Sequence, residues 1–152
     1  MATDDIAQGI AKVEGWSISG SLAQRNNNPG NLRYVGQAGA VPGDGGFAYF
    51  SSPEDGWAAL NRQIELDASR GLDLSSFMQK YAPSQDGNDP TSYAAMLANG
   101  LGVSPFAKLS DIISGVAYDD SEDTKGSLEI GASSLWLLAG AALVGLFLFA
   151  SD

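Results

Sequence analysis

The chain has 152 residues, which is the length of one domain with little left for a second. It carries 18 acidic and 8 basic residues, a net charge of −10, which argues against a nucleic-acid partner because that would require a basic surface. There is no cysteine and no histidine, so disulfides, thiolate and ordinary zinc sites, and Ser-His-Asp or Cys-His catalysis are excluded. Acid–base chemistry near neutral pH must therefore use a carboxylate of raised pKa, a tyrosine or a lysine.

The first predicted element is a helix. Thr3 and Asp4 can cap its start, and apolar residues then recur on one face as far as Val13. Gly15 follows directly and is the expected stop, since glycine adopts the left-handed conformation that ends many helices. We therefore expect a helix from about residue 3 to residue 13.

Residues 31–50 change character. Leu32 and Tyr34 alternate with polar neighbours, and a second apolar stretch at 47–50 follows a loop with five glycines among residues 36–46. This pattern predicts two short strands with a flexible connection.

Four further helices are predicted after this insert. Three of them begin with a capping residue followed by proline, and glycine or proline ends the first three. The expected fold class is therefore α+β and mostly α, with a small β-hairpin insert. The expected helix ranges are 52–71, 74–81, 89–100 and 104–116.

Residues 130–150 form the most apolar stretch of the chain and carry no charge. With a helical rise of ~1.5 Å per residue, they would cross the ~30 Å hydrocarbon core of a bilayer. We therefore expect one C-terminal transmembrane helix, with a buried core helix as the alternative. Residues 119–127 hold four carboxylates and one lysine, which favours a solvated tether. The expected organisation is a domain at 1–117, an acidic tether at 118–129 and the span at 130–150.

Glu14 is the candidate for acid–base chemistry. It follows the apolar stripe at the last turn of the first helix, where partial burial and the carbonyl dipoles of the helix end both disfavour its charged form. Its pKa is therefore expected to be raised, so that the acid can donate a proton near neutral pH. The alternative is an ordinary surface glutamate at a frayed helix end.

The segment from Arg25 to Arg33 reads RNNNPGNLR. Asparagine, proline and glycine in this order predict a tight turn. The four asparagine amides also supply donors and acceptors together, as sugar hydroxyls and acetamido groups require. Aromatic rings are candidates for stacking on sugar faces, although their spacing also suits a helix core. These rings belong to Tyr34, Tyr49, Phe50, Tyr81 and Tyr93.

Four pieces of the sequence together resemble one family. They are Glu14-Gly15-Trp16, RNNNPGNLRY at 25–34, FAYF at 47–50 and GWAAL at 56–60. In this order they resemble lysozyme-like lytic transglycosylases, most closely the muralytic proteins carried in phage virions. The resemblance covers about residues 4–115 and implies a lysozyme-like fold for the domain at 1–117.

The resemblance also implies roles for individual residues. Glu14 matches the catalytic acid/base that closes the first helix in that family. The asparagine-rich turn and the aromatic residues after it match the lining of the glycan cleft. The implied substrate-binding residues are Asn28, Asn31, Arg33, Phe50, Tyr81 and Tyr93, and no metal or cofactor is implied.

The implied reaction cleaves peptidoglycan between N-acetylmuramic acid and N-acetylglucosamine. Glu14 donates a proton to the glycosidic oxygen, the sugar's own C6 hydroxyl captures the oxocarbenium-like centre, and the product is a 1,6-anhydro sugar. A hydrolytic muramidase, the second choice, usually holds another carboxylate across the cleft. Asp44 is the candidate for that group, but its place in the glycine-rich loop favours a turn residue.

The expected partners are peptidoglycan glycan strands and, through residues 130–150, a lipid membrane. A muralytic domain with such a span suggests a virion membrane, or alternatively the host inner membrane, and a task in phage genome entry or host lysis. Other virion membrane proteins are further candidate partners. Two other classes stay open: an inactive lysozyme-like protein that binds peptidoglycan or builds the virion, and a membrane-anchored inhibitor or assembly factor.

Overall fold

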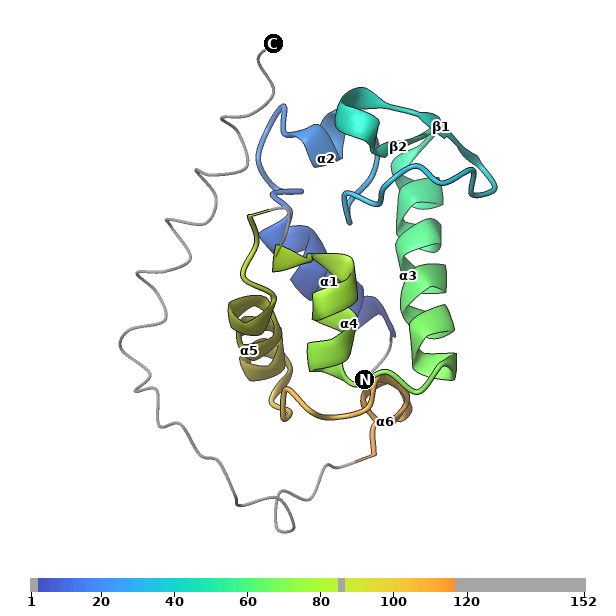
Figure 1. The fold of residues 1–152 in the computed structure, drawn as a ribbon. Coiled ribbons are helices and arrows are strands. Elements are labelled where there is room, and N and C mark those ends of the chain that lie inside the picture. Colours follow the sequence, from blue (N-terminus) through green and yellow to red (C-terminus); the bar gives the residue numbers. More distant parts are fainter. Residues whose placement is uncertain (1–2, 85–86, 117–152) are drawn as a thin grey trace. The chain divides into compact units, whose positions relative to one another are not determined.

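The computed structural model of the chain describes residues 3–84 and 87–116, which fall into two units (Figure 1). The first unit comprises residues 3–72 and 108–116, and the second comprises the described residues between them. Helices dominate, and the first unit also holds a two-stranded antiparallel sheet. The expected class, α+β and mostly α, is confirmed.

The acidic tether expected at 118–129 and the membrane span expected at 130–150 lie outside the described residues. Within the described ranges, no helix is both long enough and apolar enough to cross a bilayer. Both units belong to the segment that we expected to form the domain at 1–117.

Helices α1 and α3 form the centre of the first unit. Helix α1, Thr3–Val13, has the bounds expected from the sequence, and it packs against helix α3, Pro53–Ser69 (Figure 1). Helix α3 begins as predicted: Ser52 accepts the backbone N–H of Asp55 at 3.2 Å, and proline occupies the first turn. The largest buried apolar residues of the two helices are Ile6, Ile10, Leu60 and Ile64.

The sheet of the first unit begins at residues that we expected to form the glycine-rich loop. Strand β1, Ala40–Pro42, pairs antiparallel with strand β2, Ala48–Phe50. The 3-10 turn η1, Asp44–Gly46, connects them. Side chains alternate along β2, so the strand presents Tyr49 to the surface and Phe50 to the core.

The strand predicted around Leu32 and Tyr34 is wrong, because that segment makes only one isolated bridge, between Arg33 and Phe47. The reason is the side chain of Asn28. Its Oδ1 accepts the backbone N–H of Leu32 at 2.9 Å, and its Nδ2 donates to the carbonyl of Leu32 at 2.9 Å. The carbonyl of Leu32 still accepts the N–H of Ala48 at 2.8 Å, but the Leu32 N–H cannot return this bond, because Asn28 binds both that N–H and the carbonyl of Ala48.

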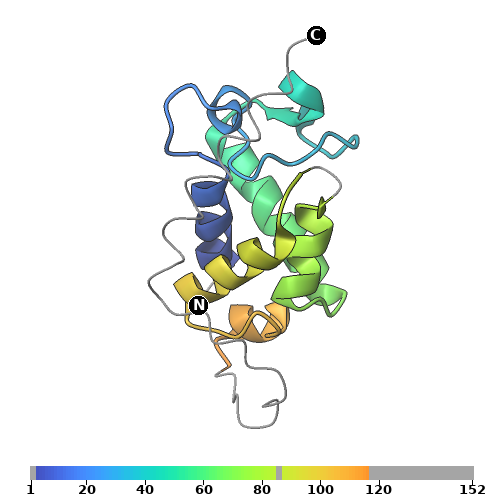
Figure 2. The ribbon, with the colours of Figure 1, turned by 60° about the vertical axis from the view of Figure 1, so that its left-hand side comes forward.

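The second unit is built on two helices that pack against each other (Figure 2). They are α4, Leu74–Tyr81, and α5, Pro90–Leu101. Each starts at an aspartate whose side chain accepts a backbone N–H three residues later. The start at Asp89 agrees with the prediction, whereas the sequence pattern did not identify Asp73 as a cap. Helix α5 runs past the expected end at Gly100, because Gly102 is the residue that takes the left-handed conformation.

Helix α6, Leu109–Ser114, packs against α3 in the first unit. We predicted that this helix begins at Ser104-Pro105, and that start is wrong. The carbonyl of Ala107 accepts the N–H of Leu74 at 3.0 Å, and the carbonyl of Pro105 binds the same turn of α4. These carbonyls therefore satisfy the start of another helix and are not available to begin a helix of their own.

Candidate active site

Glu14 occupies the C-terminal cap of α1. Its N–H donates to the carbonyl of Ile10 at 2.9 Å, and Gly15 then turns the chain with a φ of 75°. The N–H of Trp16 donates back to the carbonyl of Ala11 at 2.9 Å, which closes the helix as a Schellman motif. The expected stop at Gly15 is confirmed, and the backbone of Glu14 is held where the helix ends.

The Glu14 side chain is partly buried, and its oxygen Oε2 accepts a hydrogen bond from Nδ2 of Asn31 at 2.9 Å. Burial raises the pKa of Glu14 above the usual value of 4.5, and the hydrogen bond from Asn31 partly opposes this rise. Burial is one of the two causes expected from the sequence. The carboxyl group therefore stays protonated to a higher pH than an exposed glutamate would.

Asn31 reaches Glu14 from the tight turn predicted at 25–33. Its backbone is left-handed, with a φ of 44°, and its N–H donates to the carbonyl of Asn28 at 3.0 Å. Its side-chain oxygen Oδ1 is buried and has no hydrogen-bond partner in the described part of the chain. The structure thus joins two of the predicted site residues, Glu14 and Asn31, across 17 positions of sequence.

The first turn of α3 supports both flanks of this pair. On one flank, a Cβ at Gly56 would lie 1.9 Å from the carbonyl oxygen of Asn27 and 2.8 Å from Cδ of Pro29. Glycine is required there, because any side chain would push the turn away from the helix. On the other flank, the ring of Trp57 packs edge-on against Trp16, with the ring centroids 5.9 Å apart. Gly56 and Trp57 both lie in the GWAAL segment at 56–60, and Trp57 also belongs to the apolar stripe expected for this helix.

Asn28 and Phe50, which we predicted to bind substrate, are both fully buried. The Asn28 amide is occupied by backbone groups, since it binds both polar groups of Leu32 and donates to the carbonyl of Ala48 at 2.9 Å. Phe50 packs in a core cluster with Ala48 and Ala59. Both side chains thus shape the loop and the sheet beside the site, and neither exposes surface on which a substrate could lie in this structure.

The other predicted binding residues lie nearer the surface. Arg33 is exposed, and its guanidinium carbon lies 4.8 Å from the centroid of the Phe47 ring. Tyr81 and Tyr93 belong to the second unit and are partly exposed. Tyr81 packs on Phe77, with ring centroids 5.5 Å apart. Substrate contact by Arg33, Tyr81 and Tyr93 stays a prediction.

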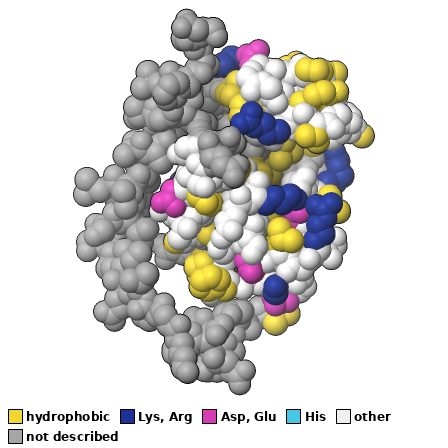
Figure 3. All heavy atoms as spheres, viewed as in Figure 1, with side chains coloured by type: hydrophobic (Ala, Val, Ile, Leu, Met, Phe, Trp, Pro, Cys, Tyr) yellow, Lys and Arg dark blue, Asp and Glu magenta, His cyan; other side chains and the backbone are white. Residues whose placement is uncertain are grey.

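Two further stacking candidates are exposed around the hairpin. Tyr34 and Tyr49 keep 37% and 39% of their surface accessible, and hydrophobic side chains are visible at the surface of this region (Figure 3, upper right). An exposed aromatic ring can cover the apolar face of a sugar. These two tyrosines are therefore not core residues, and their stacking on a sugar stays a prediction.

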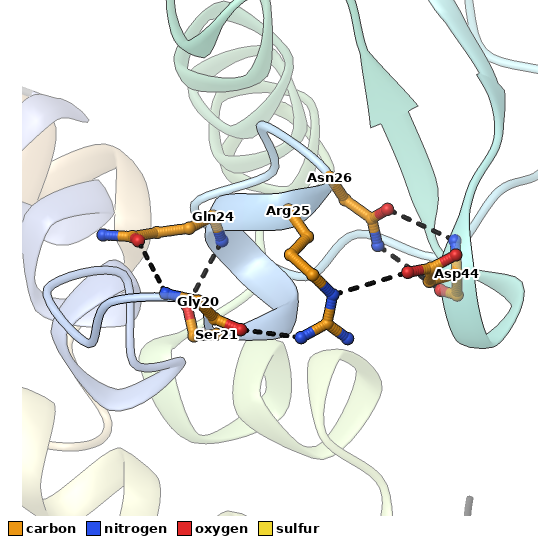
Figure 4. Close-up of polar contacts among 6 residues, drawn as sticks. All are labelled: Gly20, Ser21, Gln24, Arg25, Asn26 and Asp44. Carbon is orange, nitrogen blue, oxygen red and sulfur yellow. Dashed lines mark hydrogen bonds and ion pairs between the residues drawn. The ribbon is translucent and has the colours of Figure 1, made fainter.

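Asp44 is held as a turn residue (Figure 4). Its N–H donates to Oδ1 of Asn26 at 3.2 Å, and its carbonyl accepts from Nδ2 of Asn26 at 3.3 Å. Its carboxylate pairs at 3.5 Å with Arg25, which ends the short helix α2, Leu22–Arg25. Arg25 also donates to the carbonyl of Gly20 at 2.6 Å. These contacts agree with the interpretation of Asp44 as a turn residue.

No group of three or more carboxylates that could hold a metal ion occurs within residues 3–84 and 87–116. A comparison of the chain with models of protein families, with curated proteins and with solved structures found no match. The site around Glu14 therefore has to carry any proposal of function by its own geometry and chemistry.

Proposed function

We propose that the chain is a lytic transglycosylase that cleaves the β-1,4 bond between N-acetylmuramic acid and N-acetylglucosamine in peptidoglycan. The observation that carries this proposal is the state of Glu14, whose pKa is raised by burial and whose carboxyl is held by the neutral amide of Asn31. A carboxyl group of this kind can act first as an acid and then as a base. The resemblance of the surrounding motifs to lytic transglycosylases supports the same reaction.

The reaction uses one proton and returns it. Glu14 donates its proton to the glycosidic oxygen while the bond from that oxygen to C1 of N-acetylmuramic acid breaks, which leaves an oxocarbenium-like centre. The C6 hydroxyl oxygen of the same sugar then bonds to C1, and its proton passes to the ionised Glu14. The product carries a 1,6-anhydro ring, no water is consumed, and Glu14 returns to its acid form.

The surroundings of Glu14 favour this route over hydrolysis by two carboxylates. A hydrolase of that kind places a second carboxyl group across the scissile bond. Asp44 is the candidate for this second carboxyl group. Its side chain is paired with Arg25, and its backbone N–H and carbonyl are both hydrogen-bonded to the side chain of Asn26. The side chain that contacts Glu14 directly is the neutral amide of Asn31.

The rest of the proposal concerns binding and location. The fold is lysozyme-like in this proposal, and the glycan strand stacks on the exposed rings of Tyr34 and Tyr49. Arg33, Tyr81 and Tyr93 contribute further contacts to the glycan. The acidic tether and the span at 130–150 anchor the domain in a virion membrane, where wall degradation assists genome entry or host lysis.

Mass spectrometry of purified sacculi treated with the full-length chain tests the proposal. We expect muropeptides that end in 1,6-anhydro sugars, and we expect them to disappear with Glu14→Gln. Glu65→Gln is the matched control, because Glu65 is an exposed glutamate on α3. Hydrated products would instead make the chain a muramidase. Binding to sacculi without any product would make it an inactive peptidoglycan-binding protein.

A further inference from the structure

We propose that Asn31 is a positioning residue for Glu14: its side-chain amide holds the oxygen Oε2 and leaves Oε1 to exchange the proton with the glycan. This role deepens the proposed function and rests on it, because both concern the same carboxyl group. It differs from the sugar contact that the resemblance implies for Asn31, since it acts through Glu14.

The contact is selective for one carboxyl oxygen. Nδ2 of Asn31 donates to Oε2 of Glu14 at 2.9 Å, and none of the described residues donates a hydrogen bond to Oε1. An oxygen that already accepts an N–H is disfavoured as the site of the acid proton, because its lone pair is engaged. The proton of the acid form therefore belongs on Oε1.

Two features of Asn31 are energetically unfavourable. Its backbone is left-handed, with a φ of 44°, and its Oδ1 is buried without a partner in the described part of the chain. Glycine would close the same turn without strain and without an unsatisfied oxygen. Features of this kind persist where a side chain serves a functional contact, and the contact that Asn31 makes is the one to Glu14.

The hydrogen bond also has an electrostatic direction. An N–H donor stabilises the ionised carboxylate, so the amide of Asn31 lowers the pKa of Glu14 against the larger rise caused by burial. The titratable side chains of the neighbouring turns of α1, the 25–33 segment and α3 are exposed. They are Lys12, Arg25, Arg33, Glu54 and Asp55.

The chain offers a matched pair of substitutions. Asn31→Gly removes the amide while glycine keeps the left-handed backbone without strain. Asn27→Gly makes the same change at the other left-handed asparagine of the turn, whose φ is 49°. The amide of Asn27 donates to the carbonyl of Phe50 at 3.0 Å and not to Glu14. Both variants lose one side-chain hydrogen bond of the turn, and only the first loses the bond to Glu14.

The pKa of Glu14 is measured directly by NMR titration of the full-length chain, labelled with carboxyl-13C glutamate and kept in detergent. Glu14→Gln assigns the resonance among the five glutamates of the sequence. The same proteins are assayed for anhydro-muropeptide release as a function of pH. We expect Asn31→Gly to raise the pKa of Glu14, to move the alkaline limb of activity to higher pH, and to lower maximal activity by ~10–10²-fold.

Asn27→Gly is expected to lower the melting temperature and to leave the pKa of Glu14 and the alkaline limb in place. Equal pKa values for Glu14 in the native chain and in Asn31→Gly would overturn the proposal, as would an equal shift in Asn27→Gly. If Asn31→Gly does not fold, Asn31→Asp replaces it. The added carboxylate is expected to raise the pKa of Glu14 above its value in the native chain. If the native chain releases no muropeptides, the proposed function fails, while the titration still decides whether Asn31 controls Glu14.

Discussion

The carbonyl oxygen of Asn27 lies against Gly56, only 1.9 Å from the position that a Cβ of residue 56 would occupy. This contact presses the first turn of α3 onto the turn that carries Asn31, and Asn31 binds Glu14 at 2.9 Å. A glycine in one helix thereby determines how the candidate acid at the end of another helix is held.

Gly56→Ala is expected to destabilise the protein and to reduce its activity. The added methyl group meets a backbone carbonyl that cannot move without displacing the turn, so the loss of stability should be about 1–3 kcal/mol. Activity on peptidoglycan should fall as well, because Asn31 moves with the turn. Urea unfolding and muropeptide release measure the two effects.

The control for this substitution is Gly100→Ala. Gly100 lies in α5 with nothing within 4 Å of its Cβ position, so alanine there should stabilise the helix by about 0.5–1 kcal/mol. If Gly56→Ala were as stable and as active as Gly100→Ala, the close packing of the turn on α3 would affect neither stability nor activity, which would contradict the prediction.

Glu14→Gln is expected to reduce activity by at least ~10²-fold, because the amide keeps the size of the side chain but cannot donate the proton. In the native chain, activity should fall on the alkaline side, since the acid form disappears as the pH passes the raised pKa of Glu14. A pH profile of muropeptide release measures both effects. Near-normal activity of the variant would remove the catalytic assignment.

The same substitution has a pH-dependent effect on stability. Because the pKa of Glu14 is raised above 4.5 in the folded state, the folded protein binds this proton more tightly than the unfolded chain does. This contribution to the free energy of unfolding is fully present below the pKa that Glu14 has in the unfolded chain. It is lost as the pH rises through the pKa that Glu14 has in the folded protein. Glu14→Gln should therefore gain stability relative to the native chain only at the higher pH, by about 0.5–2 kcal/mol. A difference in melting temperature that is the same at acidic and alkaline pH would contradict this.

Asp44→Asn is expected to have a small effect. The ion pair with Arg25 is exposed, with 68% of the Asp44 side chain and 52% of the Arg25 side chain accessible, so its loss should cost about 0–1 kcal/mol. The asparagine keeps the backbone contacts to Asn26, and the anhydro product should still form. Mass spectrometry of the products of the native chain and of this variant distinguishes the two reactions. A hydrated product that the native chain forms and Asp44→Asn does not would identify a two-carboxylate muramidase.

The ring pair of Trp16 and Trp57 should show measurable coupling. Edge-on aromatic pairs stabilise proteins by about 0.5–1.5 kcal/mol beyond the area that they bury. In a double-mutant cycle of Trp16→Leu and Trp57→Leu, urea unfolding should therefore give a non-additive term of that size. Strictly additive losses would show that the two rings do not hold the segment after Glu14 to α3.

Residues 118–150 are expected to determine location and not chemistry, since the site residues lie before residue 95. A chain that ends at Ala117 should stay in solution and keep its activity on purified peptidoglycan. The full-length chain should resist extraction by high salt and carbonate and be released by detergent. Release by salt alone would indicate an electrostatic attachment, and a folded but inactive shortened chain would contradict the tether.

Local patterns sufficed to predict most helices of the part of the chain that the structure describes. The cap at Ser52, the aspartate that begins α5 and the stop at Gly15 all act within a few residues of themselves. For the same reason, the position of Glu14 at a helix end and the rise of its pKa could be expected from the order of apolar and polar residues in α1.

Tertiary structure alone decided which side chains of RNNNPGNLR serve the fold and which one meets Glu14. Asn28 and Asn31 are chemically identical, yet Asn28 is enclosed by Leu32 and Ala48, whereas Asn31 reaches the end of α1. Tertiary structure also decided that the first strand of the sheet is Ala40–Pro42 and not the predicted segment around Leu32. These outcomes depend on hydrogen bonds and close packing between residues far apart along the chain, and such contacts follow from the path of the backbone and not from any local pattern.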